Sequence, residues 1–444
     1  TELTRLMRRY PREGYMLSSI SSTIKWKAFS MLNRLADVRS QTSAEPGIYP
    51  PTNYSDSAGD LIWVFCSTIG ELNACLPFIK SLELRGQLVL ITDRHCYRES
   101  YQKHFGNAYV VELTGRTTDG SYLTAQLPPS LFFVCEIPAM PCDAPCRLSY
   151  GLLHQAKSVG ARVHLVNAWL YDYAPACRMD SLEVRLFRKE YLDSFDSIGV
   201  QNENIRSRLI QAGAREERIS ITGNMKFDSL WDENIRITDE TSRPILSYLE
   251  NSNSPIVVAG CLADIDECYI LIDAIRAIRI SHPDIRFIIA PRHPENQCFM
   301  QSLTEKLEQS GLAYKMKSKL STVELAGNGL LLLDTFGELK SFYSIATICY
   351  VGCNHNVLEP LAFGKPTIVS GEWNPLYPSY PVYQLTRDKK LIMHVDKSEG
   401  ISRKIIEYTT KNASEEGRSK QIFAQLKSLS GAVERTLNTT QLAS

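Results

Sequence analysis

The sequence lacks the features of three common protein classes. It has no run of about 18 apolar residues, the length that a transmembrane helix needs, so none of its 444 residues is expected to cross a membrane in a helix. Lys+Arg and Asp+Glu both number 49, and the absence of a positive excess excludes broad nucleic-acid binding. A Walker A pattern is also missing, which excludes a P-loop nucleotide site.

Cysteine is present, but without the spacing of a metal site. The 12 cysteines include no C-x-x-C pair, and neither C-x-x-x-C spacing has a second pair at zinc-ribbon distance. Several lie inside apolar runs, as Cys66 does at the end of the run 61–66. We therefore interpret the cysteines as reduced core thiols of a protein in a reducing compartment.

Residues 1–54 differ from the rest and are expected to form an arm and a linker. Residues 1–40 carry eight basic and three acidic residues, interleaved with Met16, Leu17, Ile20, Ile24, Trp26 and Phe29. This pattern fits a basic amphipathic segment on an anionic membrane surface, or a leading arm that packs on the body of the protein. Residues 40–59 are rich in Pro, Ser, Gly and Asp, which predicts a linker. The sequence begins with Thr1 rather than Met, so an upstream membrane anchor stays an open alternative.

Short apolar runs then alternate with helical stretches in two series. In the first domain, residues 55–228, we predict strands at 61–66, 87–92, 130–135, 162–167, 197–200 and 219–222, with helices at 70–84, 146–160 and 203–212. Residues 229–254 are polar and predict an interdomain junction. In the second domain, residues 255–405, the predicted strands are 255–259, 286–290, 329–333, 347–351 and 367–370. Residues 406–444 predict a C-terminal helical segment.

Such alternation is typical of βαβ units around parallel sheets that are covered on both faces. We therefore predict an α/β fold of the GT-B class, with two Rossmann-like doubly wound domains facing a central cleft and a C-terminal helix. Length agrees with this prediction, because 444 residues exceed one ordinary core.

The segment S-T-I-G-E at 67–71 follows the first strand of the body and opens a helix. Ligands of open α/β sheets bind at the carboxyl ends of strands, and Gly70 would let the backbone turn closely there. Glu71 has two interpretations: a general base that takes a proton from an acceptor hydroxyl, or a capping-box carboxylate paired with Ser67 or Thr68.

Three segments of the second domain also follow predicted strands. P-R-H-P-E at 291–295 offers Arg292 and His293, and a guanidinium suits phosphate or carboxylate recognition. D-T-F-G-E-L at 334–339 opens a helix whose amides would bind an anion by backbone, without lysines. H-N-V-L-E-P at 355–360 fits a ribose or phosphate clamp. The alternative is that these segments have a structural role only, as a surface turn and ordinary helix caps.

G-N-M-K-F-D at 223–228 closes the first domain, where an interdomain ligand would pass. Lys226 could contact an anionic donor sugar there, although a single lysine is more often a surface residue.

In combination these segments resemble the 3-deoxy-D-manno-octulosonic acid (Kdo) transferase family of lipopolysaccharide synthesis, from about residue 61 to residue 436. P-R-H-P-E is unchanged, and the family's G-N-L-K-F-D, G-D-T-M-G-E-L and H-N-x-L-E-P have close counterparts. The family's V-N-A-R-L becomes V-N-A-W-L at 166–170, and its closing G-A-x-E-R-T-L occurs at 431–437.

The resemblance implies an inverting transfer of Kdo from CMP-Kdo to a lipid A precursor or a related acceptor, with Glu71 as catalytic base and no metal or cofactor. It also implies a peripheral protein on the cytoplasmic face of the inner membrane. With the reading of the residues, it assigns acceptor-binding roles to Ser67, Gly70 and Glu136. Donor-binding roles fall to Lys226, Arg292, His293, Thr335, Phe336, Gly337, Glu338, His355, Asn356 and Glu359.

The sequence also departs from the family. The family's S-T-H-x-G-E is replaced by G-C-L-A-D at 260–264, its E-T-E-L-W-P-N by E-I-P-A-M-P-C at 136–142, and the loop before His355 is short. Two alternatives therefore stay open: a GT-B transferase of another CMP-activated acid sugar, and a catalytically weakened nucleotide-binding paralogue that acts as a scaffold.

Overall fold

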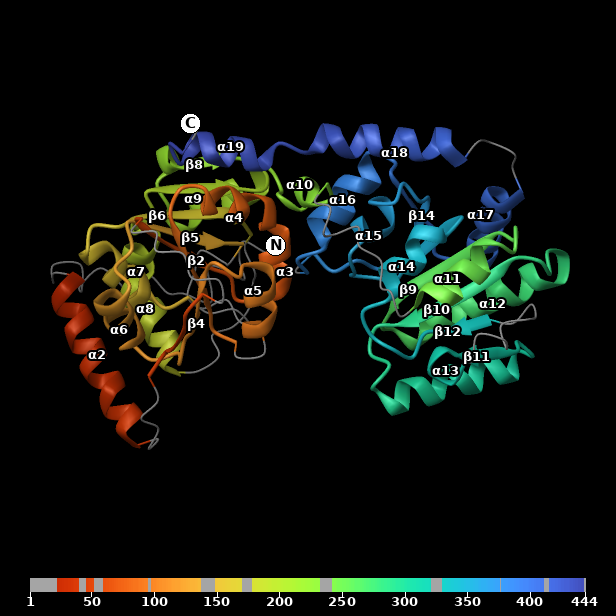
Figure 1. Ribbon diagram of the computed structural model, residues 1–444, viewed down its shortest axis with the longest axis horizontal. Coiled ribbons are helices and arrows are strands. Elements are labelled where there is room, and N and C mark those ends of the chain that lie inside the picture. The colour runs from red at the N-terminus through yellow and green to blue at the C-terminus, as the bar shows by residue number, and fades with distance from the viewer. Residues whose placement is uncertain are drawn as a thin grey trace. The chain divides into compact units, whose positions relative to one another are not determined.

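The computed structural model describes residues 22–39, 45–51, 59–94, 97–136, 148–169, 178–231, 242–320, 330–375, 377–410 and 415–442. These residues form two compact units: unit 1 is Thr1–Ser229 with Ser430–Ser444, and unit 2 is Leu230–Leu429. Each unit is a doubly wound α/β domain (Figure 1), which confirms the predicted GT-B class with two Rossmann-like domains.

Unit 1 is built on one sheet in the order β1-β4-β3-β2-β5-β6-β7-β8, parallel except for the β1–β4 pair. Its strands are β1 (Gly47–Tyr49), β2 (Leu61–Phe65), β3 (Gln87–Thr92), β4 (Tyr109–Glu112), β5 (Leu131–Cys135), β6 (Arg162–Ala168), β7 (Ser197–Val200) and β8 (Ile219–Ile221). Its helices are α2 (Ser22–Arg39), α3 (Ile69–Ala74), α4 (Leu76–Glu83), α5 (Arg98–His104), α6 (Asp119–Gln126), α7 (Tyr150–Ser158), α8 (Arg178–Asp193), α9 (Glu203–Ala212), α10 (Lys226–Ser229) and α19 (Ala432–Thr439).

Unit 2 is built on a parallel sheet in the order β11-β12-β10-β9-β13-β14-β15. Its strands are β9 (Ile256–Leu262), β10 (Arg286–Pro291), β11 (Tyr314–Met316), β12 (Leu330–Leu332), β13 (Ile348–Val351), β14 (Thr367–Val369) and β15 (Ile392–His394). Its helices are α11 (Arg243–Glu250), α12 (Ile265–Ser281), α13 (Gln297–Gln309), α14 (Leu339–Ile345), α15 (Leu358–Leu361), α16 (Tyr380–Asp388), α17 (Ser398–Thr410) and α18 (Glu415–Leu429).

The continuous apolar run of β2 shows why each sheet has helices on both faces. Successive side chains of a strand point to opposite faces. Trp63 and Phe65 accordingly join one core with residues of α2, α6, α7 and α8. Ile62 and Val64 join a second core with residues of α3, α4 and α19. A strand that is buried on both faces is apolar throughout and does not alternate with polar residues. Such continuous apolar runs are the pattern from which we predicted a parallel sheet.

Several predicted elements differ from the structure. The helix predicted at 70–84 is two helices, α3 and α4, separated at Cys75, whose φ of −97° and ψ of 7° leave the helical region. Pro77 follows in the first turn of α4, where its missing N–H is tolerated. The linker predicted at 40–59 contains β1, an edge strand antiparallel to β4, and the predicted junction contains α11 of unit 2.

The N-terminal arm packs on unit 1 within the described range 22–39. Trp26 and Phe29 are buried, and the Trp26 ring lies edge-on to Tyr150 and Phe187 at centroid distances of 5.6 and 5.7 Å. Lys25 Nζ forms a 2.9 Å ion pair with Glu190 Oε1. The packing alternative therefore holds for these side chains. Met16, Leu17 and Ile20 lie outside the described residues.

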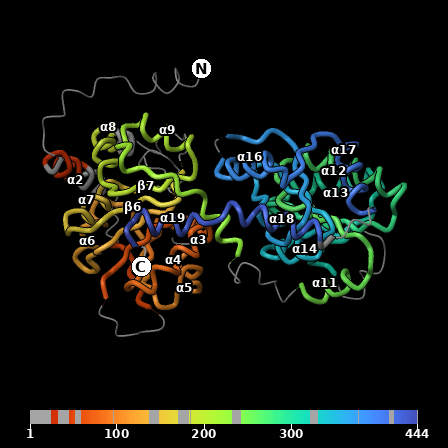
Figure 2. The backbone as a smooth tube through the Cα atoms, turned by 90° about the horizontal axis from the view of Figure 1, so that it is seen from above, coloured from red at the N-terminus to blue at the C-terminus, as the bar shows by residue number. Residues whose placement is uncertain are grey.

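The C-terminal segment expected at 406–444 is divided between the units. Residues 430–444 return to unit 1, where α19 lies beside α10 and β7 (Figure 2). Asp228 fixes the start of α19 on unit 1, because its carboxylate accepts from Gly431 N at 2.7 Å and Ala432 N at 3.0 Å. Arg435 Nε donates to Thr222 O at 2.8 Å. These contacts give the G-A-x-E-R-T-L segment a structural role.

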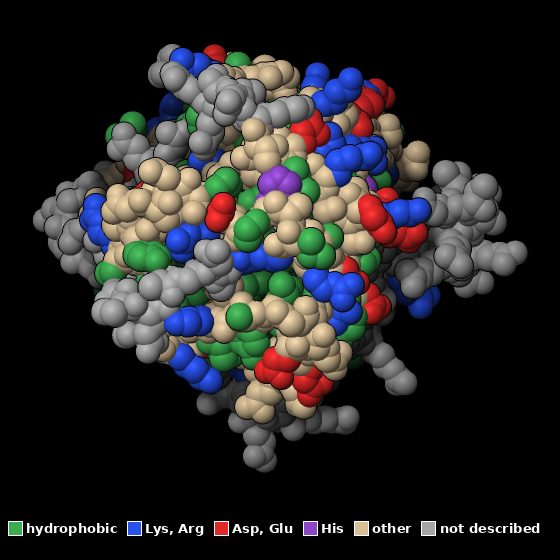
Figure 3. All heavy atoms as spheres, turned by 90° about the vertical axis from the view of Figure 1, so that its right-hand side faces the viewer, with side chains coloured by type: hydrophobic (Ala, Val, Ile, Leu, Met, Phe, Trp, Pro, Cys, Tyr) green, Lys and Arg blue, Asp and Glu red, His purple; other side chains and the backbone are tan. Residues whose placement is uncertain are grey.

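The surface charges and the burial of most described cysteines agree with the predictions from the composition. The described side chains on the face in Figure 3 mix basic and acidic groups. Among the described cysteines, six are buried free thiols, namely Cys66, Cys75, Cys135, Cys261, Cys268 and Cys349. Cys298 is exposed and Cys353 half-buried, so the prediction of core thiols is wrong for Cys298. No helix in the described parts of the chain is long and apolar enough to cross a membrane.

A buried histidine makes the stability of unit 1 depend on pH. His164 on β6 stacks on Phe133, its Nδ1 lies 2.8 Å from Ser197 Oγ, and burial lowers its pKa to about 4. Between this value and the ordinary pKa of about 6.5, the unfolded chain binds a proton that the folded chain does not, so stability falls as pH falls through this window. We expect a loss of about 2 kcal/mol in the free energy of unfolding between about pH 7 and about pH 5.

Chemical denaturation of wild type and His164→Gln at both pH values measures this loss. The variant should show a smaller fall, whereas the control His104→Gln, at an exposed site, should behave as wild type. Equal falls in wild type and His164→Gln would contradict the assignment.

Candidate functional site

The candidate residues of unit 1 lie at the carboxyl ends of β2 and β5. These neighbouring strands mark the point where the strand order reverses, since β3 and β4 lie on one side and β6 to β8 on the other. Glu71 follows β2, and Glu136 follows β5 directly. Open α/β sheets bind ligands at such reversal points because the loops on either side diverge.

Glu71 is buried and caps α3. Its Oε2 accepts from Ser67 N at 2.6 Å and Thr68 N at 3.3 Å, while Thr68 Oγ1 accepts from Glu71 N at 3.3 Å, which completes a capping box. The capping interpretation is therefore observed, with Thr68 rather than Ser67 as the cap. A carboxylate has about four acceptor positions, so capping through Oε2 is compatible with proton acceptance.

Ser67 and Gly70 have different surroundings. Ser67 is buried and its Oγ donates to Asp93 Oδ1 at 2.5 Å, so Asp93, at the carboxyl end of β3, belongs to this site although sequence reasoning missed it. Gly70 does not make the close turn that we predicted. It lies exposed in α3 without a positive φ, and a Cβ there would meet only Thr68 Oγ1, at 3.7 Å.

The buried Glu136 forms an ion pair with the half-buried Lys226 in unit 1. Lys226 Nζ lies 3.0 Å from Glu136 Oε1, and the same oxygen accepts from Asn167 Nδ2 at 2.9 Å. Burial raises the pKa of Glu136 and the ammonium of Lys226 opposes this rise. The structure thus brings together two predicted residues that are 90 positions apart (226 − 136). Residues 137–142 lie outside the described residues.

In unit 2 a bulge on β9 shapes the reversal point between β9 and β13. Gly260 pairs with Ala290 but Leu262 with Pro291, so Cys261 is the extra residue, and its φ is +58°. Arg292 N then donates to Leu262 O at 2.8 Å. Burial raises the pKa of the Cys261 thiol to about 12, so this residue presents a neutral thiol where the family has the S-T-H segment.

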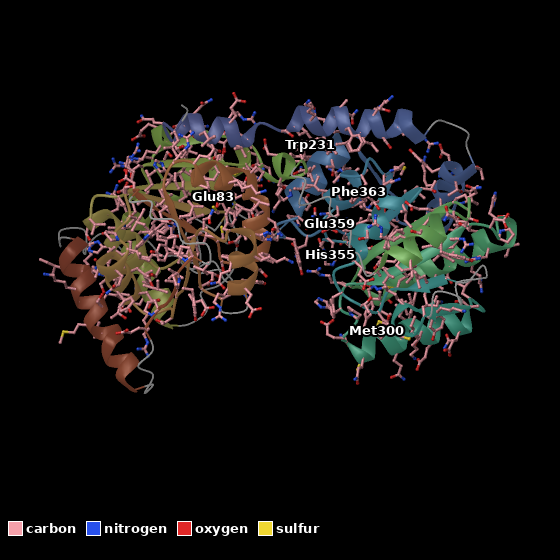
Figure 4. The ribbon with its side chains drawn as sticks, viewed as in Figure 1. Glu83, Trp231, Met300, His355, Glu359 and Phe363 are labelled. Carbon is pink, nitrogen blue, oxygen red and sulfur yellow. The ribbon has the colours of Figure 1, made fainter. Side chains whose placement is uncertain are left out.

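Positive groups surround one carboxylate beside this bulge. Burial raises the pKa of Glu359, while Lys340, Arg292 and a hydrogen bond with Asn356 lower it. Burial, with Arg292 and His293 nearby, lowers the pKa of His355 to about 4, so its imidazole is neutral at physiological pH. Figure 4 labels His355, which precedes α15, and Glu359, which lies within that helix. Such a cluster suits a phosphate and a hydroxyl-bearing ligand.

The loop before His355 is held by partners that sequence reasoning missed. Cys353 N donates to Glu267 Oε1 at 3.1 Å, and Asn354 Oδ1 accepts from Asn374 N at 2.7 Å. Asn354 has a φ of +64°, and Asn356 Oδ1 accepts from Leu358 N, the first residue of α15, at 3.1 Å. The short loop is therefore anchored.

A lysine from another part of unit 2 adjoins the segment 334–338, where we predicted an anion site made by backbone amides. Lys317 forms an ion pair with the buried carboxylate of Glu338, whose Oε2 also accepts from Ser242 Oγ at 2.6 Å. Phe336 is 66% exposed, which is unusual for a large aromatic ring. In the same segment, Gly337 has a φ of +88° and Thr335 is half-buried.

His293, in the segment 291–295, is exposed, and its Nδ1 lies 2.9 Å from Glu295 Oε1.

Comparison with known proteins finds similarity to one family of glycosyltransferases. The model of the 3-deoxy-D-manno-octulosonic-acid transferase (kdotransferase) family matches residues 147–229, which include Asn167 and Lys226. The Kdo transferase of Bordetella pertussis is 28% identical over 327 residues, which cover 69% of this chain and 70% of that protein. A bifunctional glycosyltransferase/methyltransferase of Fusobacterium nucleatum is 22% identical over 71% of this chain, and the match spans 47% of its length, about half.

Among solved structures, a glycosyltransferase of Rickettsia africae aligns with a TM-score of 0.59 at 11% identity, covering 87% of this chain and 99% of that one. At such identity the likeness concerns the fold alone. Together with the strand-end residues described above, the sequence matches lead to one conclusion. The match of residues 147–229 to the family model and the likeness to Kdo transferases over about 70% of the chain support its placement as a divergent member of the Kdo transferase family.

Proposed function

We propose that this protein transfers Kdo from CMP-Kdo to a lipid A precursor or a related lipopolysaccharide acceptor, with inversion and with Glu71 as general base. The observation that carries the proposal is the ion pair of Lys226 with the buried Glu136, at the carboxyl ends of the same sheet that bears Glu71. The ammonium of Lys226, whose side chain is 23% exposed, is held against a buried carboxylate, and a donor sugar with a carboxylate would give this oriented cation a purpose.

The reaction would be a direct displacement. The acceptor hydroxyl attacks the anomeric carbon of Kdo, the bond to the phosphate of CMP breaks, and the hydroxyl proton passes to the Glu71 carboxylate. Lys226 would hold the sugar carboxylate, and Glu136 would hold Lys226 in place. Ser67 and Gly70 would line the acceptor side, where the exposed, side-chain-free Gly70 permits close approach.

Residues of unit 2 would hold the cytidine nucleotide. Arg292 supplies a guanidinium for the phosphate, and the neutral imidazole of His355 can donate one hydrogen bond without adding charge. Glu359 would accept from ribose hydroxyls. The exposed ring of Phe336 offers a stacking surface for the base. The remaining donor-side residues in this proposal are His293, Thr335, Gly337, Glu338 and Asn356.

A lipid acceptor requires access to a membrane surface. The outer face of α2 exposes Ile24, Met31 and Leu32, which lie at helical spacing, together with the basic Lys27. An apolar stripe beside a cation suits the interface of an anionic bilayer. We therefore propose peripheral attachment at the cytoplasmic face of the inner membrane through this face of α2.

One observation favours a second candidate. Cys261 lies where the family has the S-T-H segment. Its thiol provides neither the imidazole nor the strong hydroxyl donors that the S-T-H side chains have. A transferase of another CMP-activated acid sugar, or a nucleotide-binding scaffold, would follow if this segment recognises Kdo.

Acceptor-dependent CMP release tests the function. The protein is incubated with CMP-Kdo, with and without lipid A precursor, and CMP is followed. Release only with acceptor supports the proposal. CMP binding by calorimetry without release supports the second candidate, and failure to bind CMP excludes both transferase hypotheses.

The nucleotide role of Glu359 gives a separate prediction. Glu359→Gln should weaken CMP binding by about 1–3 kcal/mol, because the charged acceptor for ribose hydroxyls is replaced by a neutral amide with one acceptor oxygen fewer. The control Glu250→Gln lies at the end of α11, before the amino end of β9, and should bind CMP normally. Unchanged affinity of Glu359→Gln in calorimetry would remove Glu359 from the site.

A further inference from the structure

Asn167 is a fully buried asparagine in a strained position at the end of β6. Its φ is +54°, a left-handed conformation that favours glycine and that asparagine tolerates best among other residues. The register explains the strain. Leu165 pairs with Ile198 and Ala168 with Val200, so β6 has one more residue than β7 over this stretch. Asn167 lies in this bulge, and bulges commonly redirect a side chain toward a site.

The side chain of Asn167 joins two segments that carry the ion pair. Its Nδ2 donates to Glu136 Oε1 at 2.9 Å, and its Oδ1 accepts from Met225 N at 2.9 Å. Met225 directly precedes Lys226, the first residue of α10. One amide therefore holds the carboxylate of the pair and the backbone that bears the ammonium.

A second path leads from the backbone of Asn167 to Lys226. Gln201 Nε2 donates to Asn167 O at 3.0 Å, and Asn224 Nδ2 donates to Gln201 Oε1 at 2.8 Å. Asn224 Oδ1 accepts in turn from Lys226 N at 3.0 Å. Gln201 and Asn224 are both buried. A satisfied buried network of this kind defines one arrangement, because any other orientation leaves polar groups without partners.

We propose that Asn167 is a positioning residue that sets the geometry of the Glu136–Lys226 pair for the anionic donor sugar. The inference rests on the proposed function for the identity of that sugar. A neutral amide suits the task, because it donates to the carboxylate without competing with the ammonium for charge. The two groups that meet at Glu136 Oε1, Asn167 Nδ2 and Lys226 Nζ, then keep a fixed angle, and the net charge presented to the ligand is unchanged.

Two substitutions distinguish the contribution of the Asn167 side-chain amide from that of its left-handed backbone conformation. Asn167→Gly retains the left-handed conformation and removes both side-chain hydrogen bonds. Asn167→Asp retains an acceptor for Met225 N and replaces the donor with a carboxylate beside Glu136. Matched controls are Asn253→Gly and Asn253→Asp, because Asn253 also has a φ of +54° but lies exposed.

We expect kcat to fall about 10- to 100-fold in both Asn167 variants, with KM for the donor changed less than about three-fold, because misplacement of a reacting group affects chemistry more than binding. In Asn167→Asp the loss should lessen toward lower pH, where the two adjacent carboxylates share a proton. Asn167→Gly should show no such pH dependence, and a purely structural role would not produce this contrast.

A readout that needs no substrate keeps this inference distinct from the proposed function. Competitive acetylation of Lys226, measured against Lys157 by peptide mass spectrometry, should rise at least about three-fold in Asn167→Gly because Glu136 and the start of α10 lose their support. If wild type shows no transferase activity, the proposed function fails while this labelling still decides the positioning role. Unchanged labelling in folded Asn167→Gly protein, confirmed by thermal unfolding, overturns the inference. A low pH that fails to restore activity in Asn167→Asp also counts against it.

Discussion

The Glu71→Gln variant should bind CMP as wild type does but transfer the sugar about 10²- to 10⁴-fold more slowly, the usual contribution of a general base. Glutamine at this position preserves the capping box, because its side-chain oxygen can accept from Ser67 N and Thr68 N as the carboxylate does. The loss should therefore come from proton acceptance and not from unfolding of α3.

The measurement is acceptor-dependent CMP release at saturating CMP-Kdo, with thermal unfolding as a check of the fold. Glu83→Gln is the matched control, because Glu83 lies in the neighbouring helix α4 with its side chain exposed. If Glu71→Gln kept more than about a third of the wild-type rate, a different base would have to be sought. Asp93, which bonds to Ser67, would be the first residue to test.

The second large effect is expected at the Glu136–Lys226 pair, where stability and catalysis can be separated. Lys226→Met leaves a buried carboxylate without its cation. Removing one partner of a fully buried pair costs about 3–5 kcal/mol, and we expect about 2–3 kcal/mol here because the Lys226 side chain is 23% exposed. Transfer should fall by about 10²-fold or more, because the ammonium that meets the anionic sugar is gone.

The double variant Lys226→Met with Glu136→Gln distinguishes the two losses. It removes the unpaired buried charge, so most of the stability should return, whereas activity should stay low. The destabilisation of the single variant should also shrink as pH falls. Burial raises the pKa of Glu136 above its unfolded value, so the folded state binds the extra proton and gains stability at lower pH.

Urea titrations of the single and double variants give the free energies of unfolding. Lys157→Met is the control, because its pair with Asp196 lies in the same unit but both side chains are about one-third exposed, and the expected cost is about 0–1 kcal/mol. If the double variant recovered activity together with stability, Lys226 would have a structural role only.

Sequence patterns predicted the class of fold because the information is local. The run in β2 is apolar throughout, so it had to be a strand covered on both sides, and the same held for β5 and β9. Elements that were missed have weak local signals. β1 and β4 contain three and four residues, and pairing with each other and with β3 stabilises them more than their own propensity does.

The motifs also located the candidate site, because strands of a parallel sheet expose their carboxyl ends on one edge. Glu71, Glu136, Arg292 and Glu359 all follow strands, as the order of apolar runs predicted. Their roles stay proposals that the variants above test.

The sequence by itself determined the two doubly wound domains, the edge of each sheet at which the candidate residues lie, and the likeness to the Kdo transferase family. Only the tertiary structure decided which residues meet. Lys226 and Glu136 pair because β5, β6 and α10 converge, Glu338 pairs with Lys317 because segments far apart in sequence adjoin, and Trp26 is buried by α7 and α8. The bulges at Asn167 and Cys261 were likewise decided by the tertiary structure and not by the local sequence. Strain in a left-handed residue is tolerated only when long-range contacts hold it, and a local pattern contains no record of those contacts.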